Sequence, residues 1–420
     1  MSFQQGLSGL NAASKNLEVI GNNIANVNTY GSKAARAEFS DVYAASLNGG
    51  GTSSVGIGTS LAAVAQRFTR GNIATTDNPM DLAITDAGFF QISDGKGLIN
   101  YTRNGQFKVD RDGYIINNNR QQLMGYRADN LGVIQPGRAV ALKLPTSGVS
   151  PSPTAKITLE VNLDARRAIT LPTAAPLVNF NDAKTYNNAT SVTAYDAKGQ
   201  EVALVYYFQK SATDTWNVYA TANGTTVAGT AGAPQPVTTI TFSPDGKAPI
   251  SPTAAVALNV PATVNSQGAN TLPITGVLLN VSGATQFGSA YGVTDLRQDG
   301  YSAGQLATIS IESNGIITAH YSNNQARPAG QIEIATFRNP QGLQPIGDNA
   351  WARTFTSGDP VAGVPGDGTL GAVQAGALEE SNVDLTAELV NMIIAQRVYQ
   401  ANAQTIKTQD QLLQTLVNLR

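Results

Sequence analysis

At both ends of the chain apolar side chains recur on a 3–4 spacing, with positions such as Ser14 and Gly21 filling gaps, and the long segment between the ends lacks this pattern. This spacing places large apolar residues on one face of each predicted helix. Such a heptad pattern is typical of helices that pack along a single seam. The chain ends therefore predict a pair of long helices, with any globular domain inserted between them. The seam residues predicted in this way are Phe3, Leu7, Leu10, Leu17, Ile24, Leu385, Leu389, Met392, Tyr399, Ile406, Leu413 and Val417.

Local signals mark where these helices begin. Ser2 with Gln5 has the spacing of a capping box, which would start the first helix at once. Ser381 or Asp384 can cap the second. The outer face of the second helix carries Asn and Gln and few charges, although a solitary helix usually shows charged residues to water. The helices could pair only within one chain, or also with neighbouring copies, and the amide-rich face favours the second alternative.

The segment between the helices has the two-residue period of β-strands. Residues 81–94 alternate between apolar and polar side chains, and three turn signals follow at Asp112-Gly113, Lys198-Gly199 and Asn314-Gly315. Turns of this kind join antiparallel strands into hairpins. We therefore expect an α+β fold that is mostly β, in which the terminal helices form a coiled-coil-like layer. Two or more antiparallel β domains are inserted between them.

Length and local composition predict the domain limits. A chain of 420 residues is expected to form more than one domain. Residues 211–290 are rich in Thr, Ala, Val, Gly and Pro and almost free of charge, which favours a separate β insertion. The predicted parts are a terminal helical assembly domain (1–30 and 377–420), connectors (31–70 and 357–376), a discontinuous inner β domain (71–148 and 300–356) and an inserted outer β domain (149–299).

Composition argues against most chemical functions. The chain has no cysteine, one histidine, a net charge of -2 and only 13% charged residues. These values give no thiolate site, no histidine cluster and no electrostatic case for nucleic acid. No apolar run approaches the roughly 20 residues that span a bilayer. We expect no enzyme activity, cofactor, metal site, nucleic-acid binding or membrane insertion.

The remaining motifs that resemble functional sites are weak. His320 lies on a predicted strand, where a structural role is expected. Residues 110–113, "DRDG", lack the spaced ligands of a calcium loop. Gly366, Gly368 and Gly371 match G-x-G-x-x-G, but no strand precedes them. A secreted β-rich enzyme or glycan-binding module is the rival class, and it predicts a stable monomer.

The stretch "GNNIANVNTYGSK", residues 21–33, ends the first predicted helix with a cluster of asparagines. Asn is a poor helix former, because its side chain competes for backbone hydrogen bonds. The stretch resembles the N-terminal signature of the bacterial flagellar rod and hook protein family, roughly N-N-x-A-N-x-x-T-x-G-[FY]-K. The usual aromatic residue before the lysine is replaced by Ser32 here. The matching residues are Asn22, Asn23, Ala25, Asn26, Thr29, Gly31 and Lys33.

Two further regions carry the same resemblance. Residues 378–420 are similar to the C-terminal helix of the family, and "DLAITDAGFF" with "YTRNGQFKVDRDGYIIN" and "LMGY" resembles its shared β region. Rod members lack a large insertion, so the insertion at 149–299 favours a hook member. A distal rod structural protein is the alternative.

The resemblance implies a non-enzymatic structural subunit that polymerises into a short curved tube. This tube would act as a universal joint that transmits torque from the rod to the filament. The implied partners are other copies of the chain, the rod and hook-filament junction proteins, the hook cap and the flagellar type III export apparatus. The implied location is the flagellar hook and basal body, outside the cell, reached without a cleaved signal peptide.

The asparagine motif then has a predicted role as a hinge. Its amides would hydrogen-bond to adjacent elements, as buried polar groups must. Thr29 and Gly31 would end the helix and turn the chain toward the β layers. We also expect the outer insertion to supply sliding contacts between copies while the terminal helices stay rigid.

Overall fold

The computed structural model describes residues 2–42, 56–129, 132–172 and 177–418. The chain divides into two compact units. The first unit consists of residues 1–146, 307–320 and 326–420, and the second consists of residues 147–306 and 321–325. The changes of unit after residues 146 and 306 lie close to the limits expected for the outer insertion. As expected, the fold is mostly β, with one helix near each end of the chain.

The first unit contains both helices, α1 (Ser2–Ala25) and α2 (Leu385–Asn418). Asp384 caps α2, because its carboxylate accepts hydrogen bonds from the backbone N–H groups of Thr386 at 2.9 Å and Ala387 at 3.1 Å. The predicted capping box at the start of α1 does not close, because the Gln5 amide instead donates to the carbonyl of Gly56. The Ser2 side chain lies outside the described part of the chain.

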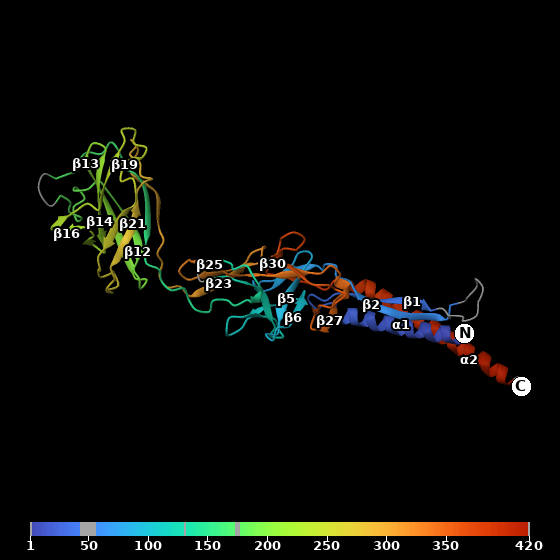
Figure 1. The fold of residues 1–420 in the computed structure, drawn as a ribbon. Helices are drawn as coiled ribbons and strands as arrows, with labels where there is room; N and C mark the ends of the chain where they lie inside the picture. The colour runs from blue at the N-terminus through green and yellow to red at the C-terminus, as the bar shows by residue number, and fades with distance from the viewer. Residues whose placement is uncertain (1, 43–55, 130–131, 173–176, 419–420) are drawn as a thin grey trace. The chain divides into compact units, whose positions relative to one another are not determined.

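A two-stranded hairpin, β1 (Ala35–Val42) and β2 (Gly58–Gln66), packs beside α1 (Figure 1). The Thr59 N–H donates to the hydroxyl of Ser8 on α1, which ties the two elements together. The Gly- and Ser-rich sequence suggested that residues 31–70 are only a connector. The structure shows that they also form two strands. That composition is concentrated at 49–60, and strands form on both sides of it, where side chains can pack on α1.

The second predicted connector also forms strands. β29 (Val361–Gly363) pairs with β26 (Ile334–Thr336), and β30 (Val373–Ala375) pairs with β4 (Leu82–Ile84). Residues 377–379 form β31 (Ala377–Glu379), which pairs with β3 (Ile73–Thr75), so α2 begins later than the expected start at 377. Short strand pairs thus lead the chain from the sheet to α2.

The largest sheet of the first unit has 13 strands, and its main path runs β23-β24-β25-β9-β5-β6-β28-β27. The predicted hairpin turns at Asp112-Gly113 and Asn314-Gly315 both occur in it. Apolar side chains such as Leu82, Phe90 and Ile334 form its core. The strands are β5 (Phe89–Ser93), β6 (Ile99–Thr102), β7 (Lys108–Val109), β8 (Ile115–Ile116), β9 (Gln122–Arg127), β10 (Val140–Ala141), β23 (Leu306–Ile311), β24 (Ile316–Tyr321), β25 (Ala326–Ile332), β26 (Ile334–Thr336), β27 (Gln344–Gly347), β28 (Ala350–Ala352) and β29, with a 3-10 helix at Pro340–Gly342.

The second unit contains a four-stranded and a six-stranded sheet that share one core, and a separate two-stranded sheet of β16 (Gly229–Thr230) and β17 (Ala233–Pro234). Leu159 from the first sheet and Phe208 and Trp216 from the second are fully buried in it, as in a β-sandwich. The turn at Lys198-Gly199 joins β12 to β13, as predicted. One pair, β11 with β21, is parallel, unlike the antiparallel pairs expected. The strands are β11 (Lys156–Asn162), β12 (Asn188–Tyr195), β13 (Glu201–Ala212), β14 (Thr215–Ala222), β15 (Thr225–Thr226), β16 (Gly229–Thr230), β17 (Ala233–Pro234), β18 (Thr238–Phe242), β19 (Pro249–Ser251), β20 (Val256–Val260), β21 (Ile274–Asn280) and β22 (Gly292–Gln298).

Candidate assembly interface

The asparagine motif ends α1 through hydrogen bonds to its own backbone. The Asn26 side chain donates to the carbonyl of Asn22 at 2.9 Å, and the Thr29 N–H donates to the carbonyl of Asn26 at 3.1 Å. These bonds satisfy carbonyl groups that lack partners at the end of a helix. The motif therefore closes the last turn of α1 locally.

Asn23 joins α1 to the β-hairpin. Its amide nitrogen donates to the carbonyl of Ala35, and its amide oxygen accepts from the N–H of the same residue, both at 2.8 Å. The side chain of Asn23 is buried, so it acts as an extra length of strand backbone beside β1. The N–H and carbonyl of Ala35, at the start of β1, thus have their hydrogen-bond partner on α1 and not on a neighbouring strand.

Gly31 turns the chain where no other residue fits. Its φ is 72°, in the left-handed region, and its N–H donates to the carbonyl of Glu379 at 2.8 Å. A Cβ at this position would lie 2.5 Å from the backbone nitrogen of Asn104. Both the backbone conformation and the space therefore require glycine here.

Lys33, the last residue of the motif, lies in a buried cluster of charges. Its ammonium group contacts one carboxylate oxygen of Glu379 at 2.5 Å, and the Arg103 guanidinium donates to the other at 3.1 Å. The Lys33 and Glu379 side chains are fully buried. Burial lowers the pKa of Lys33, and the Glu379 carboxylate opposes that shift. Ser32, where the family has an aromatic residue, is also buried.

Neighbouring polar groups complete this cluster. Lys33 also donates to the carbonyl of Thr69, and the N–H of Gly71 donates to the Glu379 carboxylate. Next to it, the Asn382 amide accepts from the N–H of Ala34 at 2.7 Å and donates to the carbonyl of Arg67 at 2.9 Å. The segments that leave α1 and enter α2 are therefore held together by side chains from both ends of the chain.

Sequence reasoning missed Glu379, Arg103 and Asn382. A lysine in a motif otherwise made of amides and apolar residues signals that an acidic partner is needed. The sequence does not show which carboxylate supplies it, because the two residues are 346 positions apart. His320 lies on β24, where its Nε2 atom is 2.8 Å from the hydroxyl of Ser310.

α1 and α2 approach each other most closely through small residues. A Cβ on Gly6 would lie 3.1 Å from Ile406, and one on Gly9 would lie 2.8 Å from the side-chain oxygen of Asn402. Ala13 on α1 and Ala395 on α2 are buried farther along. Gly6, Gly9 and Ala13 have the same 3–4 spacing as the predicted seam, one position away from it. The spacing of these small residues could have predicted the helix contact from the sequence. The larger apolar residues next to them have the same spacing and were assigned to the seam instead.

Ile406 is the one predicted seam residue against which Gly6 or Gly9 lies, and Leu7 and Leu10 are each one position away from these glycines. Six of the predicted seam residues are exposed within a single chain, namely Phe3, Leu7, Leu385, Leu389, Tyr399 and Leu413. Five are half-buried, namely Leu10, Leu17, Ile24, Met392 and Ile406. The side chain of Val417 lies outside the described residues. Their burial between copies of the chain therefore stays a prediction.

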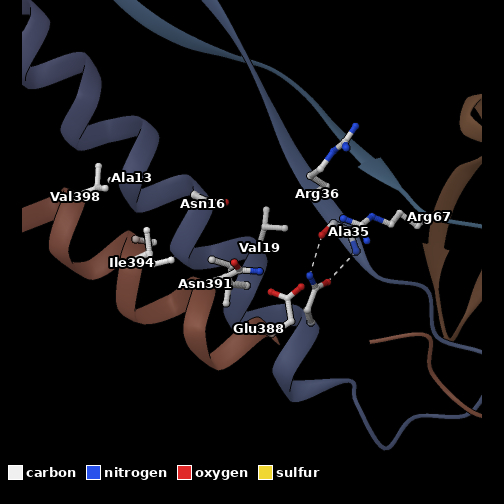
Figure 2. Close-up of a pocket in the computed structure, with 13 residues that line it drawn as sticks. Ala13, Asn16, Val19, Ala35, Arg36, Arg67, Glu388, Asn391, Ile394 and Val398 are labelled. Atoms are coloured by element: carbon white, nitrogen blue, oxygen red, sulfur yellow. Dashed lines mark hydrogen bonds between the residues drawn. The ribbon is translucent and has the colours of Figure 1, made fainter. Parts of the chain in front are cut away.

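Near the motif, α1, α2 and the hairpin leave a groove of about 310 Å³ between them (Figure 2). Val19 on α1 and Ile394 and Val398 on α2 line it with apolar atoms, and Arg36 and Arg67 lie on its hairpin side. The helices thus close tightly at Gly6 and Gly9 and leave space at their other end.

Four family models match successive parts of the chain. The "Flagella basal body rod protein" model matches residues 3–33, and the "Flagellar hook protein FlgE/F/G D1 domain" model matches 83–192. The "Flagellar basal body protein FlaE D2 domain" model matches 162–301, and the "Flagellar basal body rod FlgEFG protein C-terminal" model matches 374–419.

The flagellar hook protein FlgE of Escherichia coli strain K12 is 40% identical over 424 residues, covering 100% of both chains. The chain belongs to the flagellar hook protein FlgE family. The FlgE of Borreliella burgdorferi is 33% identical over 453 residues, covering 100% of this chain and 99% of the relative. The crystal structure of Helicobacter pylori flagellar hook protein FlgE2 has the same fold, with a TM-score of 0.54, at 15% identity over 73% of this chain and 100% of that one.

As a member of the FlgE family, the chain is a structural subunit of the flagellar hook and not an enzyme. The family implies that it polymerises with itself and lies in the flagellar hook and basal body. Within the described residues, no helix is long and apolar enough to cross a membrane. The same residues contain no group of three or more His, Cys, Asp or Glu side chains placed to hold a metal ion.

Proposed function

We propose that copies of this chain assemble through their terminal helices into a short curved tube that works as a universal joint, transmitting torque from rod to filament. The supporting observation is the apolar surface of α2. Burying one such side chain contributes about 1.5–3 kcal/mol, so neighbouring copies gain stability by covering them. The large apolar residues that α2 exposes by 38% to 56% are Leu385, Leu389, Val390, Ile393, Ile394, Val398, Tyr399, Leu412 and Leu413.

Torque must also pass from the helices to the β units. The cluster of Lys33, Glu379 and Arg103 supports this step, because it joins both helix ends to the strands through buried charge-assisted bonds. Asn23 adds a second connection to β1. The motif then works as a fixed joint within each subunit, and not as a loose hinge.

The outer unit supplies contacts that slide when the tube bends. The composition of the outer unit supports such sliding contacts, because residues 211–290 carry almost no charge and many small polar side chains. Polar, hydrated contacts can rearrange more easily than one dry core. A chain lacking residues 149–299 tests this point, and tubes that still form and curve normally would contradict it.

The further partners of the chain are the rod and hook-filament junction proteins, the hook cap and the flagellar type III export apparatus. Export proceeds without cleavage of a signal peptide. α1 supports this view, because residues 2–25 contact both α2 and the hairpin and their removal would expose those surfaces.

Charge substitutions in the helices test the assembly. Leu17→Asp and Ile406→Asp each place a carboxylate at a half-buried apolar site, and both are expected to abolish tube formation. Asn11→Asp and Thr408→Asp are matched controls at exposed positions of the same helices. Tube yield is measured by sedimentation and electron microscopy. Normal yield from both core variants would refute assembly through this seam.

A further inference from the structure

The helix pair is uneven in length, and α2 continues past the start of α1 (Figure 1). Gly6 lies against Ile406 and Gly9 against Asn402, so the antiparallel register brings Ser2 close to residue 410. The remaining residues, 411–418, have no α1 beside them and extend for about 12 Å at 1.5 Å per residue. We call this segment the overhang.

Two apolar side chains of the overhang, those of Leu412 and Leu413, face solvent. Leu412 is 56% exposed and Leu413 is 55% exposed, and residues 411–415 are all exposed. The only carboxylate near it within the described residues of α2 is Asp410, which accepts a hydrogen bond from Gln414 at 3.0 Å. The C-terminal end of a helix also carries a partial negative charge.

The groove at the opposite end of the helix pair has complementary features. Val19, Ile394 and Val398 line it with apolar atoms, beside polar groups such as Asn16 and Asn391. Its volume of about 310 Å³ is at the lower end of the range of ligand pockets. Arg36 and Arg67 provide positive charge, partly offset by Glu388. Arg36 already pairs with Glu38, whereas Arg67 has no ion-pair partner within the described residues.

A chain cannot place its own overhang in its own groove. Leu413 and Val398 lie on the same helix, 15 residues apart, which separates them by about 22 Å. The tight contact at Gly6 and Gly9 lies between the two sites. An overhang that enters this groove must therefore come from another copy of the chain.

We propose that the overhang of one copy docks into the groove of the next, with Leu412 and Leu413 against Val19 and Val398 and the negative helix end facing Arg67. This inference rests on the proposed assembly through the terminal helices. Because the two surfaces lie at opposite ends of the helix pair, each docking event leaves a free overhang and a free groove. Such a heterologous contact does not close after two copies, and it continues as an open helical assembly when its rotation does not close a ring.

Cysteine cross-linking of the full chain tests this contact directly, since the chain has no cysteine of its own. Chains carrying Leu413→Cys are mixed with chains carrying Val19→Cys, polymerised and oxidised. Covalent dimers containing one chain of each kind are expected, and a chain with both substitutions should give a ladder of linked subunits. The matched control pairs Leu413→Cys with Val64→Cys, an exposed apolar site on β2 outside the groove.

A second variant tests the groove without cysteines. Val19→Trp would fill the groove and is expected to raise the critical concentration for polymerisation about tenfold or more, as the loss of one buried apolar contact implies. The monomer should keep its circular dichroism spectrum, and Val64→Trp should have little effect.

The outcomes separate the two proposals. If polymers form but the Leu413–Val19 pair links no better than the control and Val19→Trp polymerises normally, the docking contact is overturned while assembly stands. If the unsubstituted chain forms no polymer, the assembly proposal fails, and the docking contact fails with it.

Discussion

Lys33 and Glu379 lie 346 residues apart in the sequence, yet their side chains meet at 2.5 Å where neither is exposed to solvent. Arg103, directly after β6, contacts the other oxygen of the same carboxylate. One carboxylate thus faces two buried cations, and the N–H of Gly71 adds a further hydrogen bond. This cluster joins both chain ends to the β structure of the first unit.

Replacing Glu379 with glutamine should destabilise the first unit strongly. The substitution leaves Lys33 and Arg103 buried without a counter-charge, and the loss of one partner of a buried ion pair typically costs about 3–5 kcal/mol. Urea unfolding followed by tyrosine and tryptophan fluorescence gives the change. Glu380→Gln is the matched control, because Glu380 is half-buried and its carboxylate accepts a hydrogen bond from the neutral Asn72 amide. A similar loss in both variants would contradict a special role for the cluster.

Asn23→Ala should reduce stability although alanine favours helices. The substitution removes two hydrogen bonds and leaves the N–H and carbonyl of Ala35 without partners, at a cost of about 1–3 kcal/mol. Asn22→Ala, at an exposed position, should change stability by less than about 0.5 kcal/mol. Hydrogen exchange at the Ala35 amide measures the effect locally. Unchanged protection of this amide in Asn23→Ala would contradict a stabilising role for the two Asn23–Ala35 hydrogen bonds.

Two glycines of α1 should respond in opposite directions. A Cβ on Gly21 meets nothing within 4 Å, so Gly21→Ala should stabilise the helix by about 0.5–1 kcal/mol. Gly9→Leu places a large side chain against Asn402, which should force α1 away from α2. Thermal unfolding and helical circular dichroism distinguish the two. If Gly9→Leu proved as stable as Gly21→Ala, the helices would not depend on this close approach.

The second unit should lose stability in acid through Asp164. The Arg166 side chain donates two hydrogen bonds to this carboxylate, and these bonds lower the pKa of Asp164 to about 2. The folded pKa lies below the ordinary value of 3.8, so the contribution is present above pH 4 or so and is lost as the pH falls toward 2. Asp164→Asn should flatten that part of the curve of unfolding free energy against pH. Glu201→Gln, at an exposed site of the same unit, should leave it unchanged.

Much of the architecture followed from local patterns. The 3–4 spacing predicted both helices, and Asp112-Gly113, Lys198-Gly199 and Asn314-Gly315 predicted hairpins that the structure contains. These features succeed because turn conformation and helical periodicity depend on residues close in sequence. The hairpin at 35–66 was missed, because its strands flank a Gly- and Ser-rich stretch and pack against α1.

The sequence by itself determined that two terminal helices enclose β domains, that Gly31 turns the chain after α1, and that the chain belongs among structural flagellar proteins. Only the tertiary structure decided that Lys33 pairs with Glu379, and that Gly6 and Gly9, not the leucines, form the closest contact between α1 and α2. The physical reason is distance along the chain. Local rules fix backbone conformation, whereas the partner of a buried charge and the face by which two helices meet depend on segments hundreds of residues apart.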